Sequence, residues 1–132
     1  MSVTVRSLDD CVLLTVTGAM DASSSGRLYD AFVGCCAGRG RRIVVDLSGV
    51  PLATRAGVRG LIVAAKCVAC AGGALRICRA SSEVEEQLAS FGFHHLLRCD
   101  PTLDAARAAV GSRTAARLPR AAAPGPADRA AA

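Results

Sequence analysis

Apolar and polar positions along the chain recur in two periods, one typical of strands and one of helices. Val3–Arg6 and Cys11–Thr17 are short runs rich in Val, Leu and Thr, and they predict a β-hairpin. Arg42–Leu47 is β-branched and apolar on both sides, which is typical of a central buried strand. Ala74–Cys78 predicts a further strand, and Leu96-Leu97 predicts a last one.

Two longer helices are predicted between these strands. A cluster of N-cap residues at Asp21–Ser25 precedes apolar residues at steps of three and four, which predicts a helix ended by Gly38 and Gly40. Val58–Ala69 repeats the same spacing, so a second helix should end at Gly72-Gly73 and pack its apolar stripe on the sheet.

Two shorter helices are predicted in the C-terminal part. Ser82, with Glu85 three residues further on, is a capping-box signal for a short helix through Ser90. Pro101 and Thr102 start a final helix through Val110. Strands that alternate with helices imply crossover connections, so we predict an α/β fold with a mixed, mostly parallel sheet of about four to five strands and about four helices.

The composition changes at residue 111. Residues 111–132 are mainly Arg, Ala, Pro and Gly with one Leu, which bury too little apolar surface to offset the entropy of ordering. We therefore expect one domain at residues 1–110 and a disordered tail at 111–132. The tail carries +3 of the formal charge of +5, which leaves the domain nearly neutral, and the chain has one Tyr, three Phe and no Trp. This composition argues against a nucleic-acid surface.

The chain shows no signal for secretion or for insertion into a membrane. No basic segment leads into an apolar stretch at the N-terminus. The longest apolar stretch, Gly57–Ala74, is broken by Arg59 and Lys66, which indicates a packed helix. We expect a cytoplasmic protein whose seven cysteines are reduced thiols.

Three groups of residues have types that active sites use. Cys67-Val-Ala-Cys70 has the spacing of a redox or zinc half-site, but it lies near a helix end and lacks a second pair of ligands, so we interpret both as core or surface residues. His94 and His95 are adjacent and therefore point in different directions. Asp46 ends a strand, where parallel sheets place ligands, but Asp before Ser-Gly is also an ordinary turn residue, and we favour that interpretation. We expect no catalysis, no metal and no cofactor.

Four short motifs follow one another along the chain. Val-x-Gly-x-x-Asp is matched at Val16–Asp21, and Val-Val-Asp-Leu-Ser-Gly-Val at Val44–Val50. Gly-Leu-x-x-Leu-Leu is approximated at Gly57–Ile62, and a Gly-Gly turn into a strand at Ala71–Leu75. In this order they resemble the STAS domains of anti-sigma factor antagonists, over about Val3–Val110. The resemblance implies the STAS fold.

The resemblance also draws attention to the start of the second predicted helix. In that family these four residues typically read Asp-Ser-Ser-Gly or Asp-Thr-Ser-Gly, and the second hydroxyl is phosphorylated by a partner that is both serine kinase and anti-sigma factor. Aligned on Gly57, the phosphoacceptor position is Ala56, the aspartate position is Thr54, and Arg55 stands between them. The usual switch is therefore expected to be absent, with Thr54 or Ser48 open as a substitute phosphoacceptor.

Electrostatics explains why this change matters. A helix N-terminus presents free amides and a partial positive charge, so it accepts a phosphate locally. The phosphate nevertheless adds about −1.5 to −2 charge to a surface that must bind a partner. Ala56 prevents that change, and Arg55 shifts the charge in the opposite direction.

The resemblance implies a protein-binding regulatory module. The predicted partner-binding residues are Asp21, Ser23, Ser24, Ser25, Thr54, Arg55, Ala56 and Gly57. By resemblance the partner is an anti-sigma factor of the serine-kinase type, bound so that a sigma factor is freed. One alternative is an accessory subunit of a transporter or stress-signalling complex that binds an ATPase subunit. A thiol switch at Cys67 and Cys70 is a third.

Overall fold

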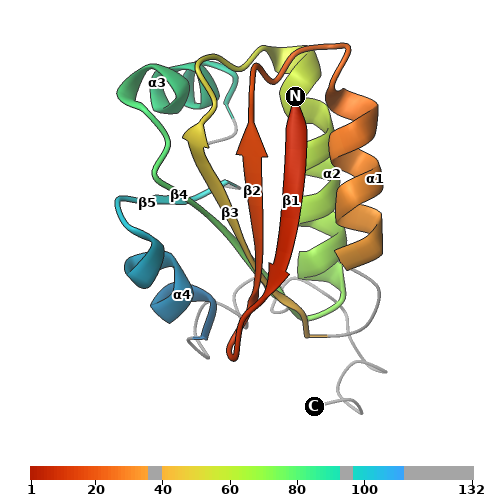
Figure 1. Ribbon diagram of the computed structural model, residues 1–132, viewed down its shortest axis with the longest axis vertical. Coiled ribbons are helices and arrows are strands. Elements are labelled where there is room, and N and C mark those ends of the chain that lie inside the picture. Colours follow the sequence, from red (N-terminus) through yellow and green to blue (C-terminus); the bar gives the residue numbers. More distant parts are fainter. Residues whose placement is uncertain (36–39, 93–96, 112–132) are drawn as a thin grey trace.

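The computed structural model describes residues 1–35, 40–92 and 97–111, which form a sheet with helices on both faces (Figure 1). The strands are β1 (Ser2–Ser7), β2 (Val12–Thr17), β3 (Arg42–Gly49), β4 (Ala74–Cys78) and β5 (Cys99–Asp100). The helices are α1 (Ser25–Cys35), α2 (Arg55–Cys70), α3 (Ser82–Ser90) and α4 (Leu103–Gly111). None of the helices in the described ranges has the length and hydropathy that a membrane crossing requires.

The five strands lie in the sheet in the order of the sequence, β1-β2-β3-β4-β5. β1 and β2 form an antiparallel hairpin in which Ser2 is opposite Thr17, whereas β2 to β5 are parallel. The prediction of a mixed, mostly parallel sheet is thus confirmed. The parallel strands end at one edge of the sheet, and α1 and α2 begin there (Figure 1).

Alternate residues of the sheet pack into two separate layers. On β3, Ile43, Val45 and Leu47 belong to the larger core, which α1, α2 and α3 close with residues such as Leu28, Leu61 and Leu88. Val44 faces the opposite side and packs with Ala106 and Val110 of α4. β3 is therefore apolar on both faces, as its continuous apolar pattern predicts.

The end of α2 confirms the predicted Gly-Gly stop. Gly72 has φ +79°, the left-handed conformation that glycine adopts without steric cost. The amide of Gly73 donates to Val68 O at 2.8 Å, and that of Gly72 donates to Ala69 O at 3.0 Å. This pair of bonds closes the last turn of α2 and directs the chain into β4.

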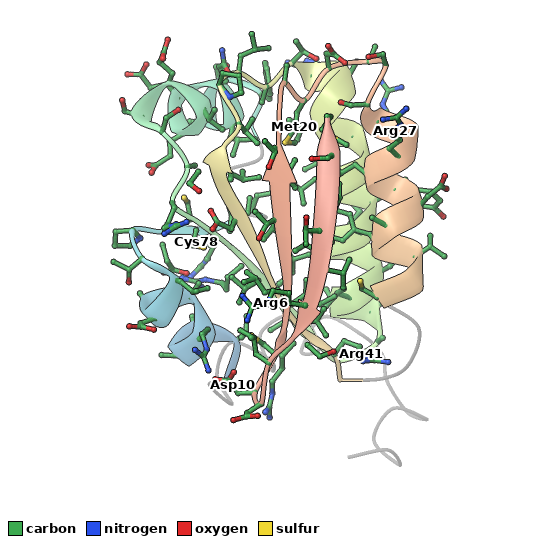
Figure 2. All side chains as sticks on the ribbon, viewed as in Figure 1. Arg6, Asp10, Met20, Arg27, Arg41 and Cys78 are labelled. Atoms are coloured by element: carbon green, nitrogen blue, oxygen red, sulfur yellow. The ribbon has the colours of Figure 1, made fainter. Side chains whose placement is uncertain are left out.

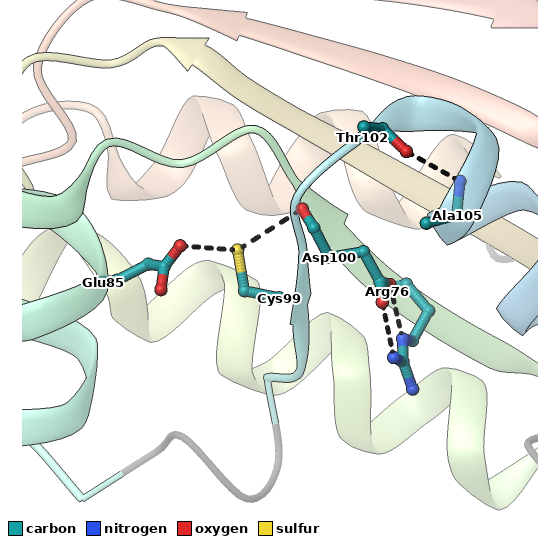
Figure 3. A network of polar contacts seen from close by, with 6 residues as sticks. All are labelled: Arg76, Glu85, Cys99, Asp100, Thr102 and Ala105. Atoms are coloured by element: carbon teal, nitrogen blue, oxygen red, sulfur yellow. Dashed lines mark hydrogen bonds and ion pairs between the residues drawn. The ribbon is translucent and has the colours of Figure 1, made fainter.

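The last strand differs from the prediction. Leu97 does not pair and is instead a buried core residue, while Cys99 and Asp100 form β5 beside Ile77 and Cys78. The Asp100 carboxylate accepts two hydrogen bonds from the Arg76 guanidinium at 2.8 Å each (Figure 3). Such a bidentate pair fixes the register of β5 on β4.

The cap of α3 also differs by one residue. The N-cap is Ser81 and not Ser82, and its Oγ accepts from the amide of Val84 at 3.2 Å.

Gly111 belongs to α4, although it was predicted to start the tail. Five predicted features lie outside the described residues: Gly38, His94, His95, Leu96 and the tail at 112–132.

Candidate functional site

The segments that follow β2 and β3 lie side by side. Met20 and Ala53 form a parallel bridge beyond the strands. The Met20 amide donates to Leu52 O at 3.0 Å, and the Thr54 amide donates to Met20 O at 2.9 Å. The structure thus brings together the two predicted groups, Asp21–Ser25 and Thr54–Gly57, at the edge where the parallel strands end (Figure 1).

Gly57 lies directly against the backbone of the β2–α1 connection. A Cβ at this position would lie 2.2 Å from the carbonyl carbon and oxygen of Met20 and 2.4 Å from the Asp21 amide nitrogen. Backbone atoms cannot rotate away as a flexible side chain does, so only glycine fits here. The first turn of α2 and Asp21 therefore form one continuous surface.

Thr54 caps the start of α2. Its backbone is extended, with φ −105° and ψ 163°, and its Oγ1 accepts from the Gly57 amide at 3.1 Å. The same hydroxyl donates to Met20 O at 3.4 Å. The Thr54 hydroxyl, considered above as a substitute phosphoacceptor, therefore both donates and accepts a hydrogen bond, although Thr54 is exposed.

The Asp21–Ser25 segment is a tight turn that its own side chains hold. Asp21 Oδ1 accepts from the Ser23 hydroxyl at 2.7 Å and from the amides of Ser23 and Ser24 at 3.0 and 3.2 Å. The Ser23 hydroxyl, followed by these amides, lowers the pKa of Asp21 below its ordinary value. Asp21 therefore presents a carboxylate near neutral pH.

The serines of this turn differ in their roles. Ser24 is buried, and its Oγ accepts from the Asp21 amide at 2.9 Å and donates to Asp21 O at 3.0 Å. Its side chain does not belong to the exposed surface, contrary to its place among the predicted partner-binding residues. Ser23 is exposed and Ser25 is half-buried.

The end of α3 and its C-cap residue, Phe91, supply two further residues to this surface. Gln87 Oε1 accepts from the Ala53 amide at 2.8 Å. The Arg55 guanidinium lies over the Phe91 ring, 5.2 Å from its centroid. Sequence reasoning missed Gln87 and Phe91 because neither has a local signal that places it beside residues more than thirty positions earlier.

Ala56 occupies the position of the family's phosphoacceptor. It is half-buried, and the exposed residues on either side of it are Arg55 and, one turn further on, Arg59. The first turn of α2 contains no acidic residue. The first turn of α2 therefore carries positive charge and has no hydroxyl at residue 56.

Asp46 lies within β3, which continues to Gly49, and not at the strand end where it was predicted, but it does have structural partners. It is 4% exposed, its Oδ1 accepts from the Ser48 amide at 2.9 Å, and its Oδ2 lies 2.8 Å from Arg79 Nη2. Burial raises the pKa of Asp46, but the Ser48 amide and the Arg79 guanidinium together lower it by more than burial raises it. The net shift of the pKa is therefore downward. Arg79 has φ +58°, an uncommon conformation for a residue with a side chain.

The Cys67 and Cys70 thiols lie in the last turns of α2 and are exposed. All the cysteines in the described ranges are free thiols. Burial raises the pKa of the Cys78 and Cys99 thiols to about 11, which makes them poor nucleophiles at neutral pH. Within residues 1–35, 40–92 and 97–111, no three His, Cys, Asp or Glu side chains are grouped so that they could hold a metal ion.

Comparison with known proteins assigns the sequence to a family. The model of the STAS domain matches residues 2–106. The chain belongs to the STAS domain family. No curated protein matches the sequence of this STAS domain.

Solved structures share the fold of this STAS domain. An anti-sigma factor antagonist from Mycobacterium paratuberculosis superposes with a TM-score of 0.75 at 22% identity, covering 84% of this chain and 94% of that one. An anti-sigma-factor antagonist (STAS) domain protein from Planctomyces limnophilus gives 0.70 at 17%, covering 83% and 98%. The anti-sigma factor antagonist SpoIIAA in its unphosphorylated form gives 0.60 at 10%, covering 79% and 92%. These likenesses establish the fold.

Proposed function

We propose that this STAS protein is a non-catalytic regulator that binds an anti-sigma factor of the serine-kinase type and thereby frees a sigma factor. The observation that carries the proposal is the packing of Gly57 on Met20 and Asp21, because it joins the Asp21–Ser25 turn and the start of α2 into one surface. Membership of the STAS family and the likeness to anti-sigma factor antagonists support it.

Binding at this surface is not ended by phosphorylation at the usual position. Ala56 has no hydroxyl, and a phosphate is the group that would add negative charge at the start of α2. Arg55, exposed and over Phe91, keeps the charge there positive. The partner is therefore released by dilution or competition and not by its own kinase activity.

The test restores the missing hydroxyl. The full chain and its Ala56→Ser variant are incubated with a purified anti-sigma factor of the serine-kinase type from the same genome, with and without ATP. We expect the wild type to bind equally in both conditions and to take up no phosphate. Ala56→Ser should bind normally without ATP, and with ATP should gain a phosphate and bind at least about tenfold more weakly, because the phosphate places like charge in the interface.

Two outcomes contradict the proposal. If the wild type binds none of the serine-kinase anti-sigma factors of its genome, the function is wrong. If mass spectrometry finds phosphate on Thr54 or Ser48 of the wild type and binding falls with it, the absence of switching is wrong.

The alternative function, an accessory subunit that binds an ATPase of a transporter or stress-signalling complex, is favoured by the same residue, Ala56. A surface that is never phosphorylated suits a permanent subunit. The genes beside this one separate the two functions: kinase or sigma-factor genes support the regulator, and transporter ATPase and permease genes support the subunit.

A further inference from the structure

Exposed apolar side chains gather where α1 and α2 lie side by side. Tyr29 and Val33 of α1 and Val63 of α2 are 43%, 50% and 37% exposed, and we call the surface that they form the α1/α2 seam. The two helices run in the same direction (Figure 1). They approach closely at Gly60, where a Cβ would lie 2.8 Å from Ser25 O and 3.3 Å from the Tyr29 amide nitrogen. Val33 and Val63 each lie one turn beyond this contact.

A row of positive charges flanks the seam on α2. Arg55, Arg59 and Lys66 are exposed and follow one side of the helix over about 16 Å. No acidic residue occurs in α2. In the described part of the chain Arg59 and Lys66 have no carboxylate partner, whereas Arg76, Arg79 and Arg107 are all paired.

The far flank of α1 is different. Arg27 lies at the start of α1 (Figure 2), and its guanidinium donates to Met1 O at 3.3 Å, beside the edge strand β1. Asp30, the one acidic residue of α1, precedes Val33 by three residues and therefore borders the seam on the α1 side. Among the described residues, the seam thus has a row of unpaired positive charges on the α2 side and one carboxylate on the α1 side.

This combination selects the chemistry of the occupant. A second copy docked with α2 against α2 would place its own Arg59 and Lys66 against like charges, which disfavours that arrangement. Apolar residues one turn apart on two parallel helices match the spacing of anchors on an amphipathic helix. From these residues we infer that the α1/α2 seam receives an acidic amphipathic helix of the partner protein. The inference rests on the proposed function only in requiring a protein partner.

The probes are three synthetic helical peptides of equal length. The first has leucines spaced four residues apart and flanked by glutamates, the second has lysines in place of the glutamates, and the third has serines in place of the leucines. Each is titrated into the isotope-labelled full chain, and amide chemical shifts are followed by NMR. We expect the acidic peptide to shift the amides of Tyr29, Val33 and Val63, and to bind at least about tenfold more tightly than the other two.

Two charge reversals on the protein sharpen the test. Arg59→Glu should weaken binding of the acidic peptide about tenfold, because it replaces attraction by repulsion beside the seam. Arg42→Glu is the control, since Arg42 is an exposed cation at the start of β3, away from the seam, and it should leave binding unchanged. Raised salt should weaken binding to the wild type.

Several results overturn the inference. If the lysine and glutamate peptides bind equally well, or if the chemical-shift changes are confined to other elements, the seam does not bind an acidic helix. Sedimentation with phosphatidylserine vesicles without peptide binding assigns the seam to a lipid surface, and concentration-dependent shifts of the seam amides without peptide assign it to a second copy. If Ala56→Ser behaves toward the anti-sigma factor as expected but Arg59→Glu does not affect peptide binding, the seam is wrong and the proposed function stands. If Arg59→Glu weakens peptide binding as expected but the anti-sigma factor binds neither the wild type nor Ala56→Ser, the proposed function is wrong and the inference about the seam stands.

Discussion

The starts of α2 and α3 have the same cap but opposite charge. Thr54 Oγ1 accepts from the Gly57 amide at 3.1 Å, and Ser81 Oγ accepts from the Val84 amide at 3.2 Å. The first turn of α3 carries Glu83 and Glu85, which the positive end of a helix favours. The first turn of α2 carries no acidic residue and begins with Arg55.

The difference indicates which of the two helix starts serves stability alone. A cation at a helix N-terminus costs about 0.3 to 1 kcal/mol, which the cation–π contact of Arg55 with Phe91 offsets by about 0.5 to 1 kcal/mol. Sequences depart from local preference mainly where function requires it. The first turn of α3 has the acidic residues that a helix start prefers, whereas the first turn of α2 has a cation instead. We interpret this unfavourable charge as a feature kept for binding a partner.

The largest expected effect is at Gly57. Gly57→Val should lower the free energy of unfolding by about 3 kcal/mol, because its side chain would overlap the Met20 backbone. The change also separates the two halves of the candidate site. Urea denaturation measures it.

Gly26 of α1 provides the control for Gly57. No heavy atom lies within 4 Å of a Cβ at Gly26, so Gly26→Ala should raise the free energy of unfolding by up to about 1 kcal/mol. If Gly57→Val were as stable as Gly26→Ala, the close contact between Gly57 and Met20 would be wrong.

Acid should act on the Asp46–Arg79 ion pair and not on the backbone contacts at the start of α2. The pKa of Asp46 is lowered from 3.8, so its stabilisation is fully present above that pH and is lost as the pH falls through the lower folded-state value. Asp46→Asn should cost about 2 kcal/mol at pH 7 and flatten the fall in stability below about pH 4. Denaturation of both proteins at several pH values checks this, and an unchanged acid profile in Asp46→Asn would assign the fall to other carboxylates.

The two caps should be worth the same for stability and differ in binding. Thr54→Ala and Ser81→Ala should each lower the free energy of unfolding by about 1 kcal/mol. Only Thr54→Ala should also weaken binding of the anti-sigma factor, and Thr54→Ser should restore both properties. Calorimetric titration and urea denaturation of the same variants provide the comparison, which fails if Ser81→Ala weakens binding as much as Thr54→Ala.

The smallest expected effects come from single charges in the two first turns. Glu83→Gln should lower the free energy of unfolding by about 0.3 to 0.5 kcal/mol. Arg55→Gln should change it by less, because relief of the unfavourable charge and loss of the Phe91 contact oppose each other. Thermal unfolding at low salt resolves the pair. A larger loss for Arg55→Gln would make Arg55 a stabilising residue.

Local patterns in the sequence predicted most of the fold, and long-range contacts decided the rest. The periodicity of Val58–Ala69 and the Gly72-Gly73 stop are local, so α2 was predictable. The place of β5 depends on the pairing of Arg76 with Asp100, which are 24 positions apart and have no shared local signal. Leu97 looked like a strand residue because it is apolar, whereas it fills the core.

The candidate site divides in the same way. Asp21, Thr54 and Gly57 were predictable as neighbours through the resemblance to the STAS family, whereas the N-cap role of Thr54 was found only in the structure. The contacts of Gln87 with Ala53 and of Phe91 with Arg55 depend on how α3 packs beside α2. The inward orientation of Ser24 depends on the hydrogen bonds of one tight turn. Ser23 and Ser24 are adjacent and identical in type, yet Ser23 is exposed and Ser24 is buried, which the sequence does not reveal.

The most direct test of a partner surface at the start of α2 is a calorimetric comparison of two charge reversals. Wild type, Arg55→Asp and Glu83→Arg are titrated with the purified anti-sigma factor, after urea denaturation has shown that all three are folded. We expect Arg55→Asp to weaken binding at least about tenfold and Glu83→Arg to leave it unchanged. Equal affinities for all three proteins, or a loss confined to Glu83→Arg, would contradict a partner surface at the start of α2.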